Sequence, residues 1–334
     1  IANPPINMNR PTDPFSLKSY VDREQYGDRP LLFGPDYTAT GDDIEDYVKT
    51  GERWVKNEAT GKYEFGGDKQ DYKFRKEAQM FFPRMGFWQE EGKKAGFRAW
   101  LNPEYNVVNR QTREVVQTFP PSGLEQAQQY AASLNKEGNL YVVKDKISFG
   151  DNMVFFFKYQ VGYMYFRYFM WNFAGRQNDL QGHGDNMHGN WLSGLSFLDE
   201  ARLGSQEHAP YFTTQNPARN TYFMLPLLLA LIGLIFHYRK MPKDAFILTL
   251  SFLFTGLAIV VYLNQKPYEP RERDYAYAGS FYFFAMWIGI GAYAIFDLLK
   301  KYLKESKVRA AVATSLGLIV PVLMGVQNWD DHNR

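Results

Sequence analysis

Four long apolar runs in the last third of the chain limit its fold more than any other feature. They cover residues 221–238, 245–263, 279–299 and 308–326. At about 1.5 Å of rise per residue, helices of these lengths reach roughly the 30 Å thickness of a bilayer hydrocarbon core. Four successive runs without a charge in their middles are rare outside membranes. We therefore predict an α-helical multi-pass membrane protein with about four transmembrane helices.

The basic residues between these runs predict an orientation. The loop after the first run carries Arg239, Lys240 and Lys243, and the loop after the third is rich in lysine. Positively charged loops of membrane proteins stay on the cytoplasmic side. Residues 1–220 and 264–278 are then expected together on the outer face. The chain opens at Ile1 without methionine and stops just after an apolar run, so we expect sequence missing at both ends, with 327–334 starting a further domain.

Composition excludes several classes of function. The chain has 334 residues, no cysteine and a net charge of +2. The missing cysteines rule out disulfides, zinc–thiolate sites and thiol nucleophiles. The near-neutral charge gives no case for a nucleic-acid partner. Aromatic residues make up 17% of the chain, a level typical of membrane-interface belts and of sugar-binding surfaces.

Residues 1–150 read as a soluble α+β region that precedes the membrane helices. The strongest local signal is Ser122 followed by Glu125, a capping box ahead of an amphipathic pattern. Alternating residues on both sides of Ala59-Thr60-Gly61 predict a hairpin. The expected elements are helices over 16–26, 42–49 and 122–135, a hairpin over 53–65 and a strand over 140–143.

The segment 151–174 is almost entirely apolar or aromatic, yet Lys158, Gln160 and Arg167 interrupt it. A charge at the bilayer centre costs at least ~2.5 kcal/mol on insertion scales. We therefore expect an interfacial or membrane-dipping helix whose cations snorkel to the surface, with a tilted span as the alternative. A glycine-rich polar loop over 175–220 follows it.

The polar segment 264–278 lies between two apolar runs, so both of its ends are pinned at a membrane surface. Two arginines with a guanidinium fork suit the phosphate of a lipid-linked substrate. Neighbouring acids could act as base or electrostatic stabiliser, and tyrosines could stack on a sugar. The balanced charges could equally form an internal ion-pair network. The residues are Arg271, Arg273, Glu269, Glu272, Asp274, Tyr268 and Tyr275, with Tyr277 as a further stacking candidate.

A second polar constellation, His183, Asp185 and His188, lies in the glycine-rich loop. Two histidines with an acid between them could hold a divalent metal, although the spacing matches no strong metal signature. The glycines also fit a tight loop whose side chains cap its own backbone and shape the acceptor side of a pocket. No metal or other cofactor is therefore assigned. Outside this loop, Gly289 and Gly291 are expected to permit close helix packing, and Asp330, Asp331 and His332 belong to a linker or could supply a base.

Several long motifs in the chain resemble those of one family. They are NPPINMNRPTDPFSLKSYVDREQYGDRPLLFGP, YFRYFMWNFAGRQNDLQGHG, GLAIVVYLNQKPYEPRERDYAYAGSFYFFAMWIG and the terminal QNWDDHNR. They are similar to a family of large bacterial inner-membrane proteins of unknown function, grouped with glycosyltransferases of the protein O-mannosyltransferase type. This chain resembles the family's middle portion.

The resemblance implies a GT-C-like enzyme of the bacterial inner membrane, with residues 1–220 and 264–278 in the periplasm. Such an enzyme would move sugar from a polyprenyl-phosphate donor to a protein or glycan acceptor. The family's presumed catalytic acid lies in N-terminal helices that this chain lacks, so the catalytic residue is unknown. The alternative is a non-enzymatic scaffold or accessory subunit of an envelope complex. Transport is disfavoured, because the apolar runs have no central charge and no sign of a broken helix pair.

Overall fold

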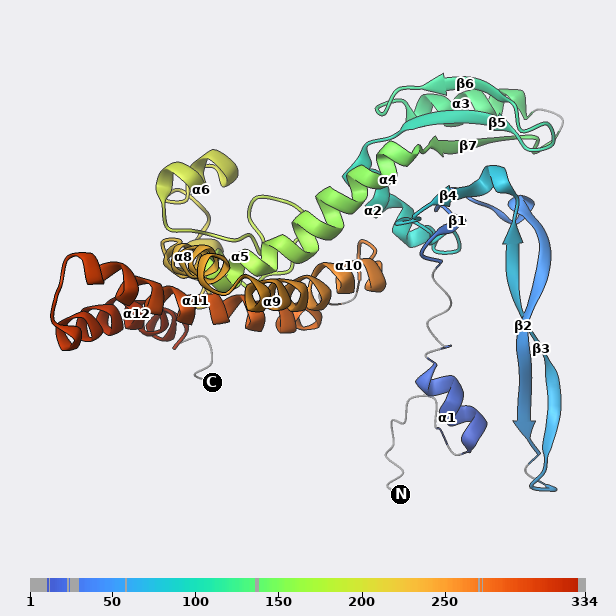
Figure 1. The fold of residues 1–334 in the computed structure, drawn as a ribbon. Helices are drawn as coiled ribbons and strands as arrows, with labels where there is room; N and C mark the ends of the chain where they lie inside the picture. The colour runs from blue at the N-terminus through green and yellow to red at the C-terminus, as the bar shows by residue number, and fades with distance from the viewer. Residues whose placement is uncertain are drawn as a thin grey trace. The chain divides into compact units, whose positions relative to one another are not determined.

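A computed structural model of the chain describes residues 11, 13–22, 24, 30–57, 59–135, 138–269, 271 and 273–329 (Figure 1). The chain forms two compact units, residues 1–153 and 154–334. The predicted residues Glu272, Asp330, Asp331 and His332 lie outside the described part, as do residues 1–10.

The core of the first unit is a three-stranded antiparallel sheet covered by one helix. The strand order is β6-β5-β7. Tyr105 and Val107 of β5 pack against Ala127 and Ala131 of the helix α3, and all four are buried. These elements are β5 (Glu104–Asn109), β6 (Val115–Phe119), β7 (Tyr141–Lys146) and α3 (Leu124–Leu134), with α2 (Glu91–Leu101) preceding them.

The helix predicted over 122–135 is therefore present, but its predicted capping box is not. α3 begins after Gly123, whose position at the N-cap provides no side-chain hydrogen bond. The strand predicted over 140–143 is also confirmed, as part of β7.

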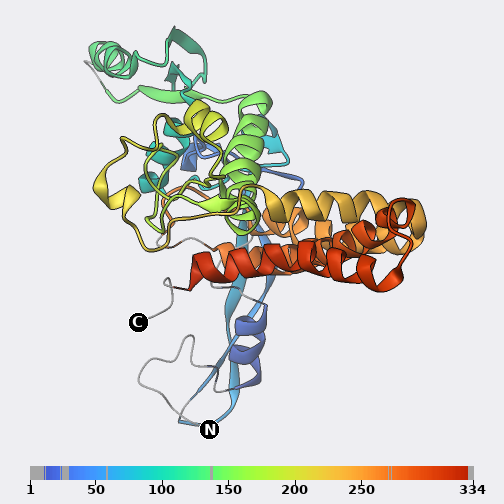
Figure 2. The ribbon, with the colours of Figure 1, turned by 90° about the vertical axis from the view of Figure 1, so that its left-hand side faces the viewer.

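A long two-stranded ribbon replaces the helix predicted over 42–49. A single 3-10 turn, Gly41–Asp43, leads directly into β2 (Ile44–Lys56), which pairs antiparallel with β3 (Tyr63–Phe74). The predicted hairpin is thus confirmed but is much longer than expected (Figures 1 and 2). Short polar segments give weak helix signals, and here cross-strand pairing of aromatic rings such as Tyr47 and Tyr72, 5.6 Å apart, decides the outcome.

The rest of the first unit consists of short elements. The helix α1 (Pro14–Val21) begins two residues before the predicted start, because the Asp13 carboxylate accepts hydrogen bonds from the amides of Phe15 and Ser16. The strands β1 (Phe33–Pro35) and β4 (Gln79–Phe81) form a small antiparallel pair.

The first long element of the second unit is an aromatic helix, 156–173, which comes after α4 (Phe149–Phe155) in the sequence. Its first part, η4 (Phe156–Phe166), is a π-helix and its second is α5 (Arg167–Phe173). The glycine-rich segment that follows contains a two-residue ladder and two short helices. These are β8 (Gly175–Arg176) with β9 (Asn220–Thr221), α6 (Ser196–Leu203) and α7 (Tyr211–Thr214).

Among the described residues, three helices of this unit are long and apolar enough to cross a membrane: Pro242–Leu263, Asp274–Lys301 and Ser306–Asn328. The sequence predicted four. The first predicted span is α8 (Leu225–Lys240), whose 16 residues reach roughly 24 Å. It starts late because 220–221 form a strand and Phe223 and Met224 have positive φ.

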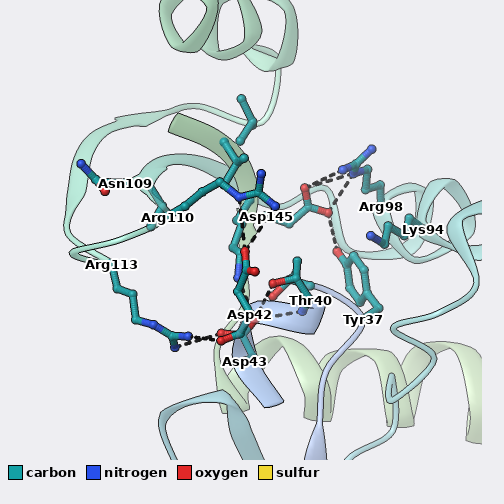
Figure 3. Close-up of a pocket in the computed structure, with 15 residues that line it drawn as sticks. Tyr37, Thr40, Asp42, Asp43, Lys94, Arg98, Asn109, Arg110, Arg113 and Asp145 are labelled. Atoms are coloured by element: carbon teal, nitrogen blue, oxygen red, sulfur yellow. Dashed lines mark hydrogen bonds and ion pairs between the residues drawn. The ribbon is translucent and has the colours of Figure 1, made fainter. Parts of the chain in front are cut away.

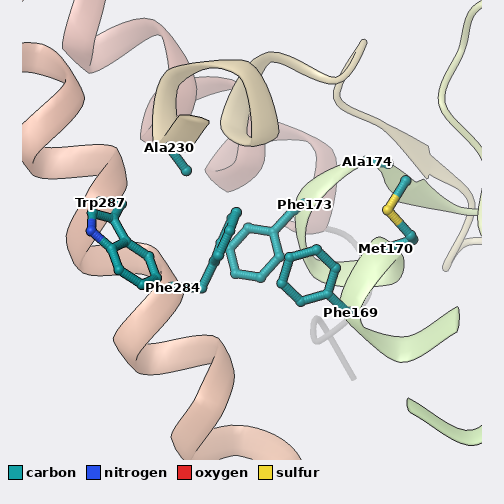
Figure 4. Packing of buried hydrophobic residues seen from close by; sticks show 7 residues of the cluster. All are labelled: Phe169, Met170, Phe173, Ala174, Ala230, Phe284 and Trp287. Atoms are coloured by element: carbon teal, nitrogen blue, oxygen red, sulfur yellow. The ribbon is translucent and has the colours of Figure 1, made fainter. Parts of the chain in front are cut away.

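The three candidate spans and α8 run alongside one another (Figure 2). The central helix, α11 (Ala278–Leu298), contacts α8, α9 (Pro242–Thr255) and α12 (Ser306–Asn328). Aromatic rings fill the space between the bundle and the aromatic helix: Phe169 and Phe173 of α5 meet Phe284 of α11 at centroid distances of 4.7 and 4.6 Å (Figure 4).

Glycines allow α8 and α11 to approach until their backbones touch. A Cβ placed on Gly233 would lie 2.0 Å from the Trp287 carbonyl oxygen, and one on Gly291 would lie 2.1 Å from the Leu229 carbonyl oxygen. The predicted packing role of Gly291 is therefore confirmed. Gly289 has open space around its Cβ position, so the same prediction was wrong for it.

We expect Gly233→Ala to destabilise the bundle, because the added methyl group collides with the backbone of α11. The loss should be roughly 1–3 kcal/mol or more, as for other overpacked cores. Thermal unfolding of the detergent-solubilised chain measures it. Gly289→Ala adds the same methyl group to α11 without a collision and serves as the control. Equal stability of the two variants would contradict the close approach.

Candidate functional site

The charged loop, 264–278, is held in place by polar side chains of the aromatic helix. The Tyr159 hydroxyl donates to the Lys266 carbonyl at 2.9 Å. The Gln160 amide donates to the Asn264 side chain and to the Gln265 carbonyl, both at 2.9 Å. Gln160 is fully buried, so these hydrogen bonds form away from water. Gln160, which interrupts the aromatic segment in the sequence, thus anchors the loop.

The long helix Pro242–Leu263, which enters this loop, is interrupted at Gly256, a feature that the sequence analysis did not predict. α9 ends at Thr255, and α10 (Leu257–Leu263) begins after Gly256. The break admits the aromatic helix, because a Cβ on Gly256 would lie 2.6 Å from the Tyr165 hydroxyl. Tyr165 in turn donates to the Ser280 hydroxyl at 3.2 Å. Tyr165 belongs to the π-helix η4, and π-helical turns are frequent at functional sites.

The two arginines of the charged loop have different surroundings. Arg273 is half-buried and lies 3.4 Å from the Glu269 carboxylate, as the ion-pair alternative predicts for this residue. Arg271 is exposed, and its guanidinium lies over the Tyr275 ring at 5.5 Å. Within the described residues, Arg271 has no carboxylate partner. Asp274 is exposed and begins the short 3-10 helix Asp274–Tyr277.

The charged loop and the glycine-rich loop meet. The rings of His183 and Tyr268 contact each other edge to face with centroids 4.9 Å apart. The Gln181 amide also reaches the Glu269 carbonyl at 3.4 Å. The Tyr163 hydroxyl, from the aromatic helix, donates to the Gly182 carbonyl at 2.5 Å. Three segments that are far apart in sequence therefore build one polar surface, which we call the loop surface.

His183, Asp185 and His188 of the glycine-rich loop, the residues that could have held a metal, do not converge. The His188 ring nitrogen Nδ1 lies 2.7 Å from the Asp185 carboxylate, and its ring stacks on Phe212, whereas His183 turns to Tyr268. Burial raises the pKa of Asp185, but hydrogen bonds from the Met187 amide and the His188 ring outweigh it, and the pKa lies below its usual value. In the described part of the chain, no three such side chains gather around a metal position.

The sequence analysis expected the cations of this segment to snorkel to the membrane surface. Arg167 does not. Its side chain is buried, and its guanidinium donates to the Gly189 carbonyl at 2.7 Å and lies 4.0 Å from the Tyr163 ring centroid. Gly189 has a φ of +59°, and a Cβ there would lie 2.9 Å from the guanidinium. The charge is thus compensated by carbonyl dipoles and aromatic faces and not by water.

Hydrogen bonds place the loop surface at one end of the helix bundle. The Asn220 side chain, at the end of the glycine-rich loop, donates to Asn328 at the end of α12. At the other end, the Lys240 ammonium lies 3.4 Å from Asp297, beside the basic turns. α8 connects these two ends.

The first unit has a separate pocket that the sequence analysis did not identify (Figure 3). Its volume is about 240 Å³, and its floor includes the cross-strand neighbours Val108 and Val142. Charged side chains form the walls. They are Asp42, Asp43, Lys94, Arg98, Arg110, Arg113, Lys144 and Asp145. Four stretches of sequence contribute them, so no local motif could reveal the cluster.

Residues 27–157 match the model of a family described as a family of unknown function (DUF8416). The match covers the first unit from residue 27 onward and includes every residue of the pocket. No curated protein and no solved structure matches the chain. No glycosyltransferase family is among these findings, so the resemblance of the chain to that class stays a prediction.

We expect Arg167→Gln to loosen the glycine-rich loop, because Gly189 loses its charged donor and the aromatic rings lose their cation. Amide hydrogen exchange of residues 182–190 in the detergent-solubilised chain should rise by at least about tenfold, equivalent to about 1.4 kcal/mol. Lys158→Gln removes an exposed positive charge from the same helix and should leave this exchange unchanged. Unchanged protection in both variants would show that Arg167 does not hold the loop.

Asp43 gives a prediction for the acid stability of the first unit. Burial raises its pKa, but hydrogen bonds from Thr40 and from Lys144 outweigh this, and the pKa is lowered. A carboxyl group with a lowered pKa stabilises the fold above its ordinary value of about 3.9, and this contribution disappears as the pH falls through the lowered value. Asp43→Asn should therefore cost roughly 1–3 kcal/mol at neutral pH and flatten the acid part of the stability curve. Asp46→Asn, an exposed change in β2, is the control for unfolding measured by circular dichroism.

Proposed function

We propose that this chain belongs to an integral-membrane glycosyltransferase that takes sugar from a polyprenyl-phosphate-linked donor and passes it to a protein or glycan acceptor on the periplasmic face. The observation that carries the proposal is the exposed guanidinium of Arg271, which lies over Tyr275 at the end of two apolar helices. A fork-shaped cation at that level suits a phosphate whose lipid tail stays in the bilayer.

We assign a role to each residue of the loop surface from its contacts. Arg271 would bind the carrier phosphate. Arg273 would instead stiffen the loop through Glu269, and Tyr268 with His183 would form the edge that faces the acceptor. The aromatic helix would line the entry of the lipid tail. Sequence motifs that resemble the protein O-mannosyltransferase class support the reaction type.

The topology that this proposal needs has four membrane helices, with α8 as the first. α8 connects the end of the bundle at Asn220 with the end at Lys240, and the contacts of these residues with α12 and α11 support a crossing over the full depth. The non-helical residues Phe223 and Met224 would complete its apolar length. Residues 1–220 and 264–278 then lie in the periplasm and the basic turns in the cytoplasm of the bacterial inner membrane.

A non-enzymatic scaffold of an envelope complex is the second candidate, and the ribbon of β2 and β3 favours it. Exposed aromatic and branched side chains lie along both strands, among them Tyr47, Trp54, Phe65 and Tyr72. Two-stranded ribbons are marginally stable alone, and large exposed rings are typical of protein-binding surfaces. A scaffold would bind partner proteins in a fixed ratio and would have no need of Arg271.

We expect Arg271→Gln to weaken binding of polyprenyl monophosphate to the chain in lipid nanodiscs by about tenfold, because one charge-assisted phosphate contact is lost. Native mass spectrometry counts the bound lipid. Arg239→Gln removes an exposed cation from the opposite, basic end and is the matched control.

The same two variants, tested in whole membranes, separate the candidate functions. Loss of sugar transfer to periplasmic acceptors in Arg271→Gln alone supports the enzyme. Equal lipid binding by both variants, together with undiminished recovery of stoichiometric partner proteins, would refute the enzyme and favour the scaffold.

A further inference from the structure

We propose that the pocket of the first unit is a binding site for a small organic anion, a sugar-sized molecule that carries a phosphate or a carboxylate. Anion binding by this unit does not depend on sugar transfer by the second. The starting point is the balance of charge in the pocket wall, where five cationic side chains face three carboxylates.

Each of the two buried carboxylates already has its own partners. Asp145 accepts a two-pronged contact from Arg98, at 2.8 and 2.9 Å, and a hydrogen bond from the Tyr37 hydroxyl at 2.7 Å. Asp43 binds Lys144 at 3.0 Å and Arg113 at 2.9 Å (Figure 3). Because buried charges need such compensation, these groups form the frame of the pocket and are not available to a ligand.

The remaining cations, Lys94 and Arg110, have partners that water can replace. Lys94 contacts Glu91, whose side chain is 81% exposed, and Arg110 contacts Asp42, whose side chain is 54% exposed. Exposed ion pairs contribute little free energy, so an entering anion can exchange for these carboxylates at small cost. Both cations line the pocket. Lys94 and Arg110 therefore carry the excess positive charge of the wall, and a ligand can reach them.

The floor and the volume limit the rest of the ligand. Val108 and Val142 lie opposite each other on β5 and β7 and present an apolar surface inside a charged rim. A sugar ring has an apolar face and a polar edge, and it fits a pocket of about 240 Å³. Asn109 and Thr38, also in the lining, can hydrogen-bond to hydroxyl groups. An anionic sugar therefore matches the whole pocket: its apolar face can pack on the valines, its hydroxyl groups can hydrogen-bond to the lining, and its charge can meet Lys94 and Arg110.

Isothermal titration of the full chain in detergent tests this proposal with three probes: glucose 6-phosphate, glucuronate and glucose. We expect one or both anions to bind and glucose to bind at least about tenfold more weakly, since it lacks the charge that Lys94 and Arg110 would meet. Preference for glucose 6-phosphate identifies a phosphate site, and preference for glucuronate identifies a carboxylate site.

The double variant Lys94→Gln, Arg110→Gln should bind the preferred anion at least about tenfold more weakly while its unfolding temperature stays unchanged, because neither change breaks a buried pair. Lys146→Gln, on the same strand as Lys144 but outside the pocket lining, is the control and should bind normally. Equal affinity for glucose and the anions, no binding of any probe by the folded chain, or unaltered anion binding in the double variant would each overturn the proposal. Sugar transfer by the second unit would be unaffected by such a result, so the two proposals fail separately.

Discussion

The second unit depends on hydrogen bonds that run from side chains of the aromatic helix to backbone carbonyls of two loops. Tyr159 and Gln160 hold the charged loop, and Tyr163 and Arg167 hold the glycine-rich loop. Backbone groups buried without partners are costly, so irregular loops at the end of an apolar bundle need donors of this kind. The helix that looks almost wholly hydrophobic in sequence provides them from one side, while its phenylalanines pack against α11.

Close packing of the helices makes this arrangement compatible with the bundle. Gly233 and Gly291 bring α8 against α11, and Gly256 interrupts the entering helix where the Tyr165 hydroxyl needs space. Small residues serve the same purpose in membrane helices generally, because there van der Waals contact replaces much of the hydrophobic driving force between helices. The positions of the loops and the packing of the helices therefore depend on the same glycines. Substituting one of these glycines would also move the loops.

The two units present different chemistry. The loop surface of the second unit exposes Arg271 over the ring of Tyr275, whereas the first unit has a charged pocket with an apolar floor. In the pocket, the two buried carboxylates pair with three of the five cations, and the other two cations, which pair with exposed carboxylates, remain exchangeable. The charges in buried pairs stabilise the fold, whereas the charges paired with exposed carboxylates can bind a ligand.

The sequence by itself determined the long apolar helices, the α3 helix and the part of the hairpin around its turn, residues 53–65, because their periodicity and turn residues act locally. It also marked the charged loop and the glycine-rich loop, but not their contact, since nothing local links His183 to Tyr268. Only the tertiary structure turned 42–49 into a strand, because pairing with β3 outweighs a weak helix signal. It also buried Arg167, shortened the helix in the first apolar run and assembled the pocket from four distant stretches. Those outcomes depend on partners brought together by folding, and no single segment contains that information.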